Sequence, residues 1–256
     1  MDLGLAGKSV LITGGSRGIG LAVAQTFAAE GCDIHIAGRS EVDLKSAAAK
    51  IGGAVKFHIG DLRTDDDLTK LAEVCADVDI LVNNAGATPT GRIDEVSIKD
   101  WREGLELKVV ATVALTKAIY AQMCERGSGV IINVIGNCGE RPDSDIIIAT
   151  VTNTGMMGFT KALGSVSPEY GVRVVGVNPG ATATERLIYI MRDKARDRTG
   201  DAENWRELLK PLPFGRASKP EEQAAMITFA ASDRCSYVSG TILTVDAGIA
   251  NRGHIF

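Results

Sequence analysis

Short runs of apolar residues alternate along the chain with longer segments whose apolar residues recur at helical spacing. The short runs are nearly continuous in Val, Ile and Leu, which is typical of strands buried on both faces of a parallel sheet. The predicted strands cover residues 9–12, 33–37, 55–59, 79–82, 130–134, 172–177 and 242–245. The predicted helices cover residues 18–30, 41–50, 65–76, 101–126, 150–168 and 221–231. This alternation predicts an α/β fold, a doubly wound parallel sheet of about seven strands with helices on both faces.

Composition supports one globular unit. The 256 residues are 45% apolar and 23% charged, and no linker, repeat or low-complexity segment interrupts them. We therefore expect a single domain spanning residues 1–256. The net charge of −4 and the lack of a basic stripe argue against a nucleic-acid partner. No apolar run reaches the length of about 18 residues that a membrane span needs, so we expect no membrane partner.

The N-terminus and the cysteines bear on location. No basic segment followed by an apolar stretch opens the chain, so we expect no signal peptide. The five cysteines are widely spaced and form no CxxC pair, which favours reduced thiols in a cytoplasmic protein and no metal site. His35 and His58 fall in the second and third predicted strands, where a structural role is expected.

A glycine-rich turn joins the first strand to the first helix, with the sequence Thr13-Gly14-Gly15-Ser16-Arg17-Gly18-Ile19-Gly20. Glycines in this context permit a tight turn and a close approach to a pyrophosphate, and the helix N-terminus offers free N–H groups. A tight turn without a ligand is the alternative. The candidate cofactor contacts in this turn are Gly14, Ser16, Arg17, Gly18, Ile19 and Gly20.

The end of the second strand indicates which dinucleotide binds. An NAD site usually places an acidic residue there to accept a hydrogen bond from the ribose 2′-hydroxyl. This chain has Gly38 followed by Arg39, and Arg17 lies in the glycine-rich turn. Two guanidinium groups suit a 2′-phosphate, so we expect NADP(H). The alternative is that Arg39 is a solvated surface charge.

Further segments match motifs of the short-chain dehydrogenase/reductase (SDR) family, which the chain resembles over nearly its full length. The turn at 13–20 resembles TGxxxGxG, residues 83–86 resemble NNAG, and residues 178–184 resemble the PGxxxT segment near the nicotinamide. The resemblance implies a Rossmann-type fold and usually a dimer or tetramer built on the helices at 101–126 and 150–168. It adds as cofactor contacts Asp61, Leu62, Asn83, Ala85, Gly86, Pro179, Gly180, Thr182 and Thr184.

The family's catalytic serine, tyrosine, lysine and asparagine do not stand at the matching positions. Alignment places Gly136 at the serine, Ala149 at the tyrosine and Asn153 at the lysine, and Lys108 stands at the asparagine. No tyrosine of the chain is followed four residues later by lysine. Because Lys108 and Asn153 exchange residue types, Lys108 could restore a positive charge behind the nicotinamide ribose with Asn153 as its hydrogen-bond partner.

Few other residues near the expected nicotinamide carry side chains that could take part in a reaction. Asn137 could polarise a substrate oxygen. Cys138 could act as a weak donor or a nucleophile, although a small packing role is the simpler interpretation. The segment at about 185–215 corresponds to the family's variable substrate lid, and Tyr189 lies in it.

These residues leave the reaction open. The leading hypothesis is an NADP(H)-dependent oxidoreductase that acts on a small-molecule carbonyl, alcohol or activated C=C, with Lys108, Asn153 and Asn137 as candidate catalytic residues. The alternative is an NADP(H)-binding pseudoenzyme that serves as a sensor or regulatory subunit. A non-redox use of Lys108 or Cys138 is a third hypothesis.

Overall fold

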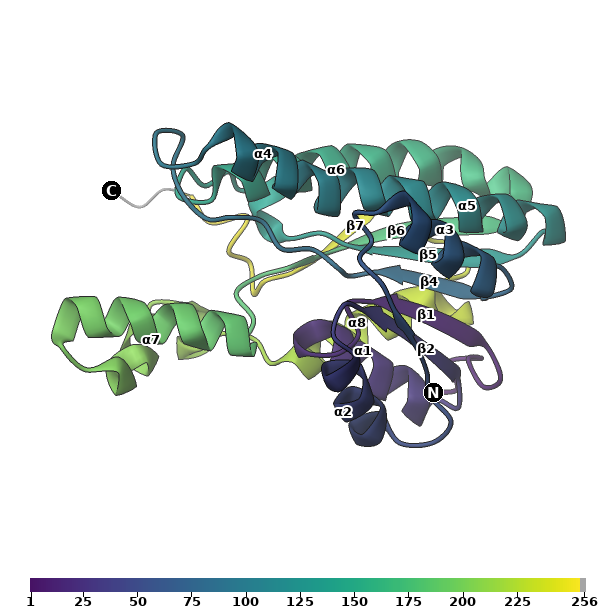
Figure 1. The fold of residues 1–256 in the computed structure, drawn as a ribbon, viewed down its shortest axis with the longest axis horizontal. Helices are drawn as coiled ribbons and strands as arrows, with labels where there is room; N and C mark the ends of the chain where they lie inside the picture. Colours follow the sequence, from purple (N-terminus) through teal and green to yellow (C-terminus); the bar gives the residue numbers. More distant parts are fainter. Residues whose placement is uncertain (254–256) are drawn as a thin grey trace.

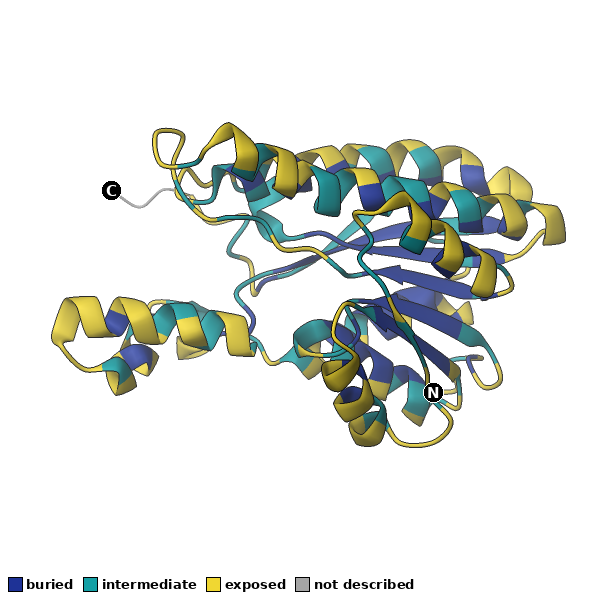
Figure 2. Ribbon diagram, viewed as in Figure 1, coloured by how far each residue is buried: buried dark blue, intermediate teal, exposed yellow. Residues whose placement is uncertain are grey.

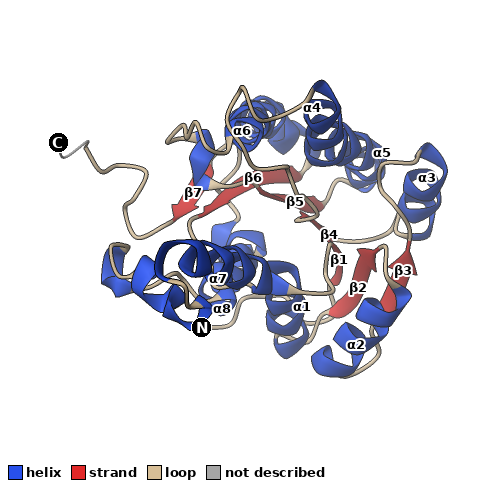
Figure 3. Ribbon diagram, turned by 60° about the vertical axis from the view of Figure 1, so that its left-hand side comes forward, coloured by secondary structure: helices blue, strands red, loops and turns tan. Residues whose placement is uncertain are grey.

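The protein folds around a single sheet in which every pairing is parallel. In this computed structural model, which describes residues 1–253, the sheet has seven strands in the order β3-β2-β1-β4-β5-β6-β7 (Figure 3). The strands are β1 (Ser9–Thr13), β2 (Asp33–Gly38), β3 (Lys56–Ile59), β4 (Ile80–Asn83), β5 (Gly129–Val134), β6 (Val172–Pro179) and β7 (Ile242–Val245). The predicted doubly wound α/β sheet is confirmed.

Helices cover both faces of the sheet (Figure 1). One face carries α1 (Gly18–Ala29), α2 (Glu41–Ile51) and α8 (Pro220–Ala231), and its core includes Phe27, Leu44 and Ile227. The other carries α3 (Asp65–Val74), α4 (Ile98–Leu105), α5 (Ala111–Arg126) and α6 (Ile147–Val166). The strands are buried throughout most of their length, and the outer helix faces are exposed (Figure 2). This two-sided burial explains the nearly continuous apolar strands.

Two helices begin three residues earlier than the sequence pattern predicts. The long helix begins at Ile98 rather than at residue 101, because Ser97 and Asp100 form a capping box at its start. The helix predicted from residue 150 begins at Ile147. Between α4 and α5 lies a π-helical turn, Glu106–Val110, which the sequence pattern did not predict.

One helical run among the described residues, Ile98–Arg126, is long and apolar enough to cross a membrane by length and composition. It comprises α4, the π-helical turn and α5. Leu115, Ile119 and Met123 on this run are buried in the core beneath α3 and α5. The packing of α5 against the sheet therefore accounts for these three apolar residues.

The segment predicted as a lid extends beyond the carboxyl ends of the strands (Figure 1). It contains α7 (Glu185–Thr199) and a short helix, Ala202–Leu209. Its own small apolar cluster is built on Ala195, Trp205 and Leu209.

The strand order reverses direction between β1 and β4, because the chain runs outward from β1 to β3 and then returns to the other side. Ligands of doubly wound sheets bind in the crevice at the carboxyl ends of strands at such a reversal. The candidate site is therefore expected where the loops after β1 and β4 meet.

Candidate active site

The turn after β1 has the backbone of a phosphate-binding loop. Gly14 and Gly18 have φ angles of +65° and +56°, a region that glycine adopts without steric cost. A side chain at Gly20 would collide with the carbonyl oxygen of Gly14. Arg17, which precedes α1, makes no side-chain hydrogen bond to the helix start. The first N–H groups of α1 therefore have no side-chain cap at Arg17, which fits a pyrophosphate site.

Hydrogen bonds hold the loops after β1 and β4 together. The Thr13 hydroxyl oxygen accepts from the backbone N–H groups of Asn84 and Ala85, each at 3.0 Å. Asn84 Nδ2 donates to the carbonyl oxygens of Thr13 at 2.9 Å and Gly14 at 3.2 Å. A Cβ at Gly14 would lie 3.1 Å from the Cα of Ala85. The predicted contacts Gly14 and Ala85 are thus brought side by side.

Asn83 points into the interior rather than toward this loop surface. Its side chain is 4% exposed and donates to the Thr116 hydroxyl and to Asn133 Oδ1, both at 2.9 Å. Asn133 in turn donates to the hydroxyl of Thr160 at 2.9 Å. The Asn83 side chain therefore ties α5, β4, β5 and α6 together beneath the site.

The segment after β6 lies against the glycine-rich turn. A Cβ at Gly18 would lie 3.1 Å from Cγ2 of Thr184, so this segment contacts the glycine-rich turn. The Thr184 hydroxyl caps α7 by accepting from Leu187 N, and the Thr182 hydroxyl donates to the Gly180 carbonyl at 3.0 Å. Pro179 ends β6 directly before Gly180.

Basic residues follow β1, β2 and β3, at the ends where the adenosine half of a dinucleotide is expected. Arg17 and Arg39 are both exposed. Asp61 accepts a hydrogen bond from Arg63 Nε at 2.9 Å. That bond, with help from the nearby charge of Arg39, holds the pKa of Asp61 below its ordinary value. Arg63 was not predicted as part of this site. Its position two residues after Asp61 is the sequence feature from which an ion pair with Asp61 could have been predicted.

Lys108 reaches the carboxyl end of β5 from the π-helical turn Glu106–Val110. Its Nζ donates to the carbonyl oxygens of Val134 at 2.9 Å and Ile135 at 3.0 Å. A Cβ at Gly86 would lie 3.2 Å from this Nζ, so the ammonium lies against the loop after β4. Burial lowers the pKa of Lys108 to about 8, because removal from water disfavours the charged form. π-helical turns of this kind often occur at functional sites.

The expected hydrogen bond between Lys108 and Asn153 does not form among residues 1–253. Asn153 Nδ2 instead donates to Cys138 Sγ at 2.9 Å. A Cβ at Gly136 would lie 2.6 Å from that same Nδ2. The missing side chain at Gly136 therefore leaves the space that the Asn153 amide occupies, and this contact replaces the predicted one.

The structure places four further candidate residues. Asn137 Nδ2 donates to the carboxylate of Asp246 at 3.1 Å, so its amide is held in place. Cys138 is partly rather than fully buried, and burial raises the pKa of its thiol. Ala149 lies in the first turn of α6. Tyr189 is 73% exposed on α7.

Two features near the site were not anticipated. Glu140 accepts hydrogen bonds from Asn178 Nδ2 at 3.0 Å and from the Thr244 hydroxyl at 2.7 Å, which joins the ends of β6 and β7. Arg186 on α7 donates to the carbonyl oxygen of Thr88 at 2.9 Å. This hydrogen bond connects α7 to the loop after β4.

Comparison with known proteins agrees with this geometry. Residues 8–195 match the family described as short chain dehydrogenase. The chain belongs to the short-chain dehydrogenase family. An uncharacterized oxidoreductase of Thermotoga maritima is 36% identical over 251 residues, which cover 94% of this chain and 97% of that protein. A 3-oxoacyl-[acyl-carrier-protein] reductase of Chlamydia muridarum is 31% identical, covering 96% and 98%.

The fold of this short-chain dehydrogenase is similar to that of an enzyme solved with bound ligands. The L-sorbose reductase of Gluconobacter frateurii, solved with NADPH and L-sorbose, has a TM-score of 0.92 and is 32% identical. The match covers 98% of this chain and all of that one. The protein is thus an oxidoreductase of the short-chain type, and its glycine cradle fits the nicotinamide dinucleotide that the family uses.

Proposed function

We propose that this protein is an NADP(H)-dependent oxidoreductase with a non-standard site, in which Lys108 replaces the family's tyrosine as the proton-holding group. The observation that carries the proposal is the Lys108 ammonium at the carboxyl ends of β4 and β5, beside Gly86. Its pKa of about 8 is close to neutral, where a general acid works best. Ala149 offers no hydroxyl at the tyrosine position.

Charge supports NADP(H) over NAD(H). Arg17 and Arg39 are exposed at the adenosine end, and β2 ends in glycine followed by arginine, with no carboxylate. Guanidinium groups bind a phosphate bidentately, whereas a carboxylate would repel it. The similar L-sorbose reductase was solved with NADPH.

The proposed reaction needs a hydride, which a bound reduced nicotinamide supplies, and a proton. Two of the three N–H groups of the Lys108 ammonium donate hydrogen bonds to the carbonyl oxygens of Val134 and Ile135. The third has no acceptor among the described residues, so it is free to donate to a substrate oxygen directly or through one water. Asn137, held by Asp246, is the proposed orienting group. The substrate is a small carbonyl, alcohol or activated C=C compound that enters beneath α7.

The test combines binding and turnover. NADPH and NADH affinities would be measured by fluorescence, and NADPH oxidation would be followed with a panel of carbonyl and enoyl substrates. We expect NADPH to bind more tightly than NADH, and Arg39→Ala to reduce that preference. Lys108→Ala should lower kcat by about 10²–10⁴-fold, the usual contribution of a positioned acid. Lys117→Ala, which changes an exposed lysine on α5, should retain wild-type kcat.

A second candidate function is NADP(H) binding without turnover, as in a sensor or regulatory subunit. This function is favoured by the polar side chains near Lys108, which form hydrogen bonds with one another. Asn153 is bonded to Cys138, and Asn137 to Asp246. Tight NADPH binding with no turnover on the whole panel would favour this function. Turnover that survives Lys108→Ala would contradict the proposed role of Lys108.

A further inference from the structure

Three side chains with metal-binding atoms meet at the β3 edge of the sheet, away from the site at Lys108. They are His35 on β2, His58 on β3 and Cys75, which directly follows α3. His58 Nε2 lies 3.2 Å from His35 Nδ1. Cys75 Sγ lies 3.5 Å from His35 Nδ1 and 3.7 Å from His58 Nε2. One nitrogen of each imidazole and the sulfur therefore converge on a single point.

Strand register brings the two histidines together. His35 pairs with Lys56, and His58 pairs with Ala37, so the histidines are diagonal neighbours on adjacent strands. Side chains two residues apart on a strand share a face, and this face is the one that α3 covers. Cys75 is 1% exposed in the core beneath α3. Three segments that are far apart in the sequence thus deliver one ligand atom each.

The triangle has the dimensions of a tetrahedral zinc site. Zn–N bonds of about 2.0–2.1 Å and Zn–S bonds of about 2.3 Å imply N–N separations of about 3.4 Å and N–S separations of about 3.6 Å. The observed N–N distance is 3.2 Å and the N–S distances are 3.5 and 3.7 Å. We propose that His35, His58 and Cys75 bind one Zn²⁺ ion, with a fourth position open to water or a small ligand.

The protonation of the two histidines suits this role. Burial lowers the pKa of His35 to about 4, with smaller contributions from the neighbouring His58 and Lys56. Burial, followed by the charge of Lys56, also lowers the pKa of His58. Both imidazoles are therefore neutral near pH 7 and hold the lone pairs that a metal requires. Burial raises the pKa of Cys75 to about 11, so the thiol releases its proton as the ion binds.

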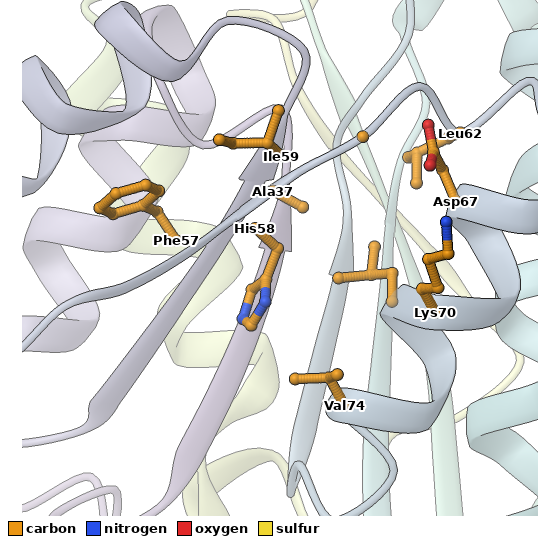
Figure 4. A pocket seen from close by; sticks show the side chains of 10 residues that line it. Ala37, Phe57, His58, Ile59, Leu62, Asp67, Lys70 and Val74 are labelled. Carbon is orange, nitrogen blue, oxygen red and sulfur yellow. The ribbon is translucent and has the colours of Figure 1, made fainter.

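A cavity adjoins the cluster on the side of His58, the side from which a fourth ligand would enter. It has a volume of about 260 Å³, and its lining includes Ala37, His58 and Val74 (Figure 4). His58 points from β3 into the space between the strand and α3. The same cavity reaches Leu62, a residue expected at the adenosine end of the dinucleotide. The ion would therefore lie near that end and apart from the Lys108 ammonium.

Metal content and spectra test the proposal. Full-length protein without a histidine tag would be stripped with a chelator, equilibrated with Zn²⁺, dialysed and analysed for metal. We expect one zinc per chain. With Co²⁺ as a probe, we expect d–d bands of a tetrahedral ion and a thiolate-to-cobalt charge-transfer band. Cys75→Ser should abolish the charge-transfer band, and His58→Gln should abolish stoichiometric zinc. Cys124→Ser, at a cysteine outside the cluster, should leave both unchanged.

Two variants are used because one of them, Cys75→Ser, changes a buried residue. Cys75 is fully buried, whereas His58 is partly exposed, so His58→Gln serves if Cys75→Ser does not fold, as judged by circular dichroism. Wild-type protein that holds no zinc after dialysis overturns the proposal. So does a folded His58→Gln or Cys75→Ser protein that retains one zinc per chain.

Discussion

At the residue scale, Lys108 makes a prediction about stability that does not depend on the substrate. Its pKa is about 8 in the folded protein, against an ordinary value of 10.5. Between these two pH values the unfolded chain binds more protons than the folded one, so stability rises with pH across this window. Relative to Lys108→Met, the wild type should gain up to about 3 kcal/mol between pH 8 and pH 10.5.

Urea unfolding of both proteins at several pH values measures this difference, and subtracting the two curves removes the titration of other groups. Lys117→Met, at an exposed position on α5, is the matched control and should follow the wild type. Parallel curves for the wild type and Lys108→Met would show that Lys108 does not titrate in this window.

Some contacts of single residues could not be predicted from the sequence. The exchange between Lys108 and Asn153 is visible in the sequence, but the partner of Asn153 is not. That partner depends on the space left by Gly136, where a Cβ would lie 2.6 Å from the amide. Likewise, His35 and Cys75 are 40 residues apart, and only the packing of the end of α3 against the sheet brings them together.

At the element scale, the strands were predictable because each is an apolar run buried on both faces. The π-helical turn Glu106–Val110 was not, because five residues are too few to set an apolar period of their own. The lid was expected from the family resemblance. The segment has its own apolar cluster around Trp205, which is 7% exposed. We therefore expect this segment to unfold or move independently of the sheet.

Trp205→Ala tests that independence. Removing a buried tryptophan typically costs about 3–5 kcal/mol of packing free energy, and here the loss should fall on the lid. Hydrogen exchange should rise in α7 and Ala202–Leu209 but stay unchanged in β1, β4 and β5. We also expect NADPH affinity to be retained while KM for the substrate rises. Exchange that rises equally in the sheet would show that the lid and sheet unfold as one unit.

At the scale of the whole molecule, the exposed apolar side chains bear on assembly. Leu115 is 1% exposed and belongs to the core, whereas Val110 and Val151 are 51% and 46% exposed. They lie on the π-helical turn and on α6, part of the helical surface through which the family usually associates. We therefore expect a dimer or tetramer in solution, with a mass above the 27.0 kDa of one chain.

Glutamate at these two positions should break that assembly. An interface with two-fold symmetry repeats each substitution on both copies, so Val110→Glu with Val151→Glu would bury four carboxylates in a dimer interface. Burying unpaired charges costs several kcal/mol, which exceeds what a few apolar contacts supply. Light scattering after size-exclusion chromatography should therefore show a smaller species. Val42→Glu, at a 77% exposed site on α2, is the control and should leave the mass unchanged. A wild type that elutes as a single chain would contradict the expectation directly, because Val110 and Val151 would then be solvated residues.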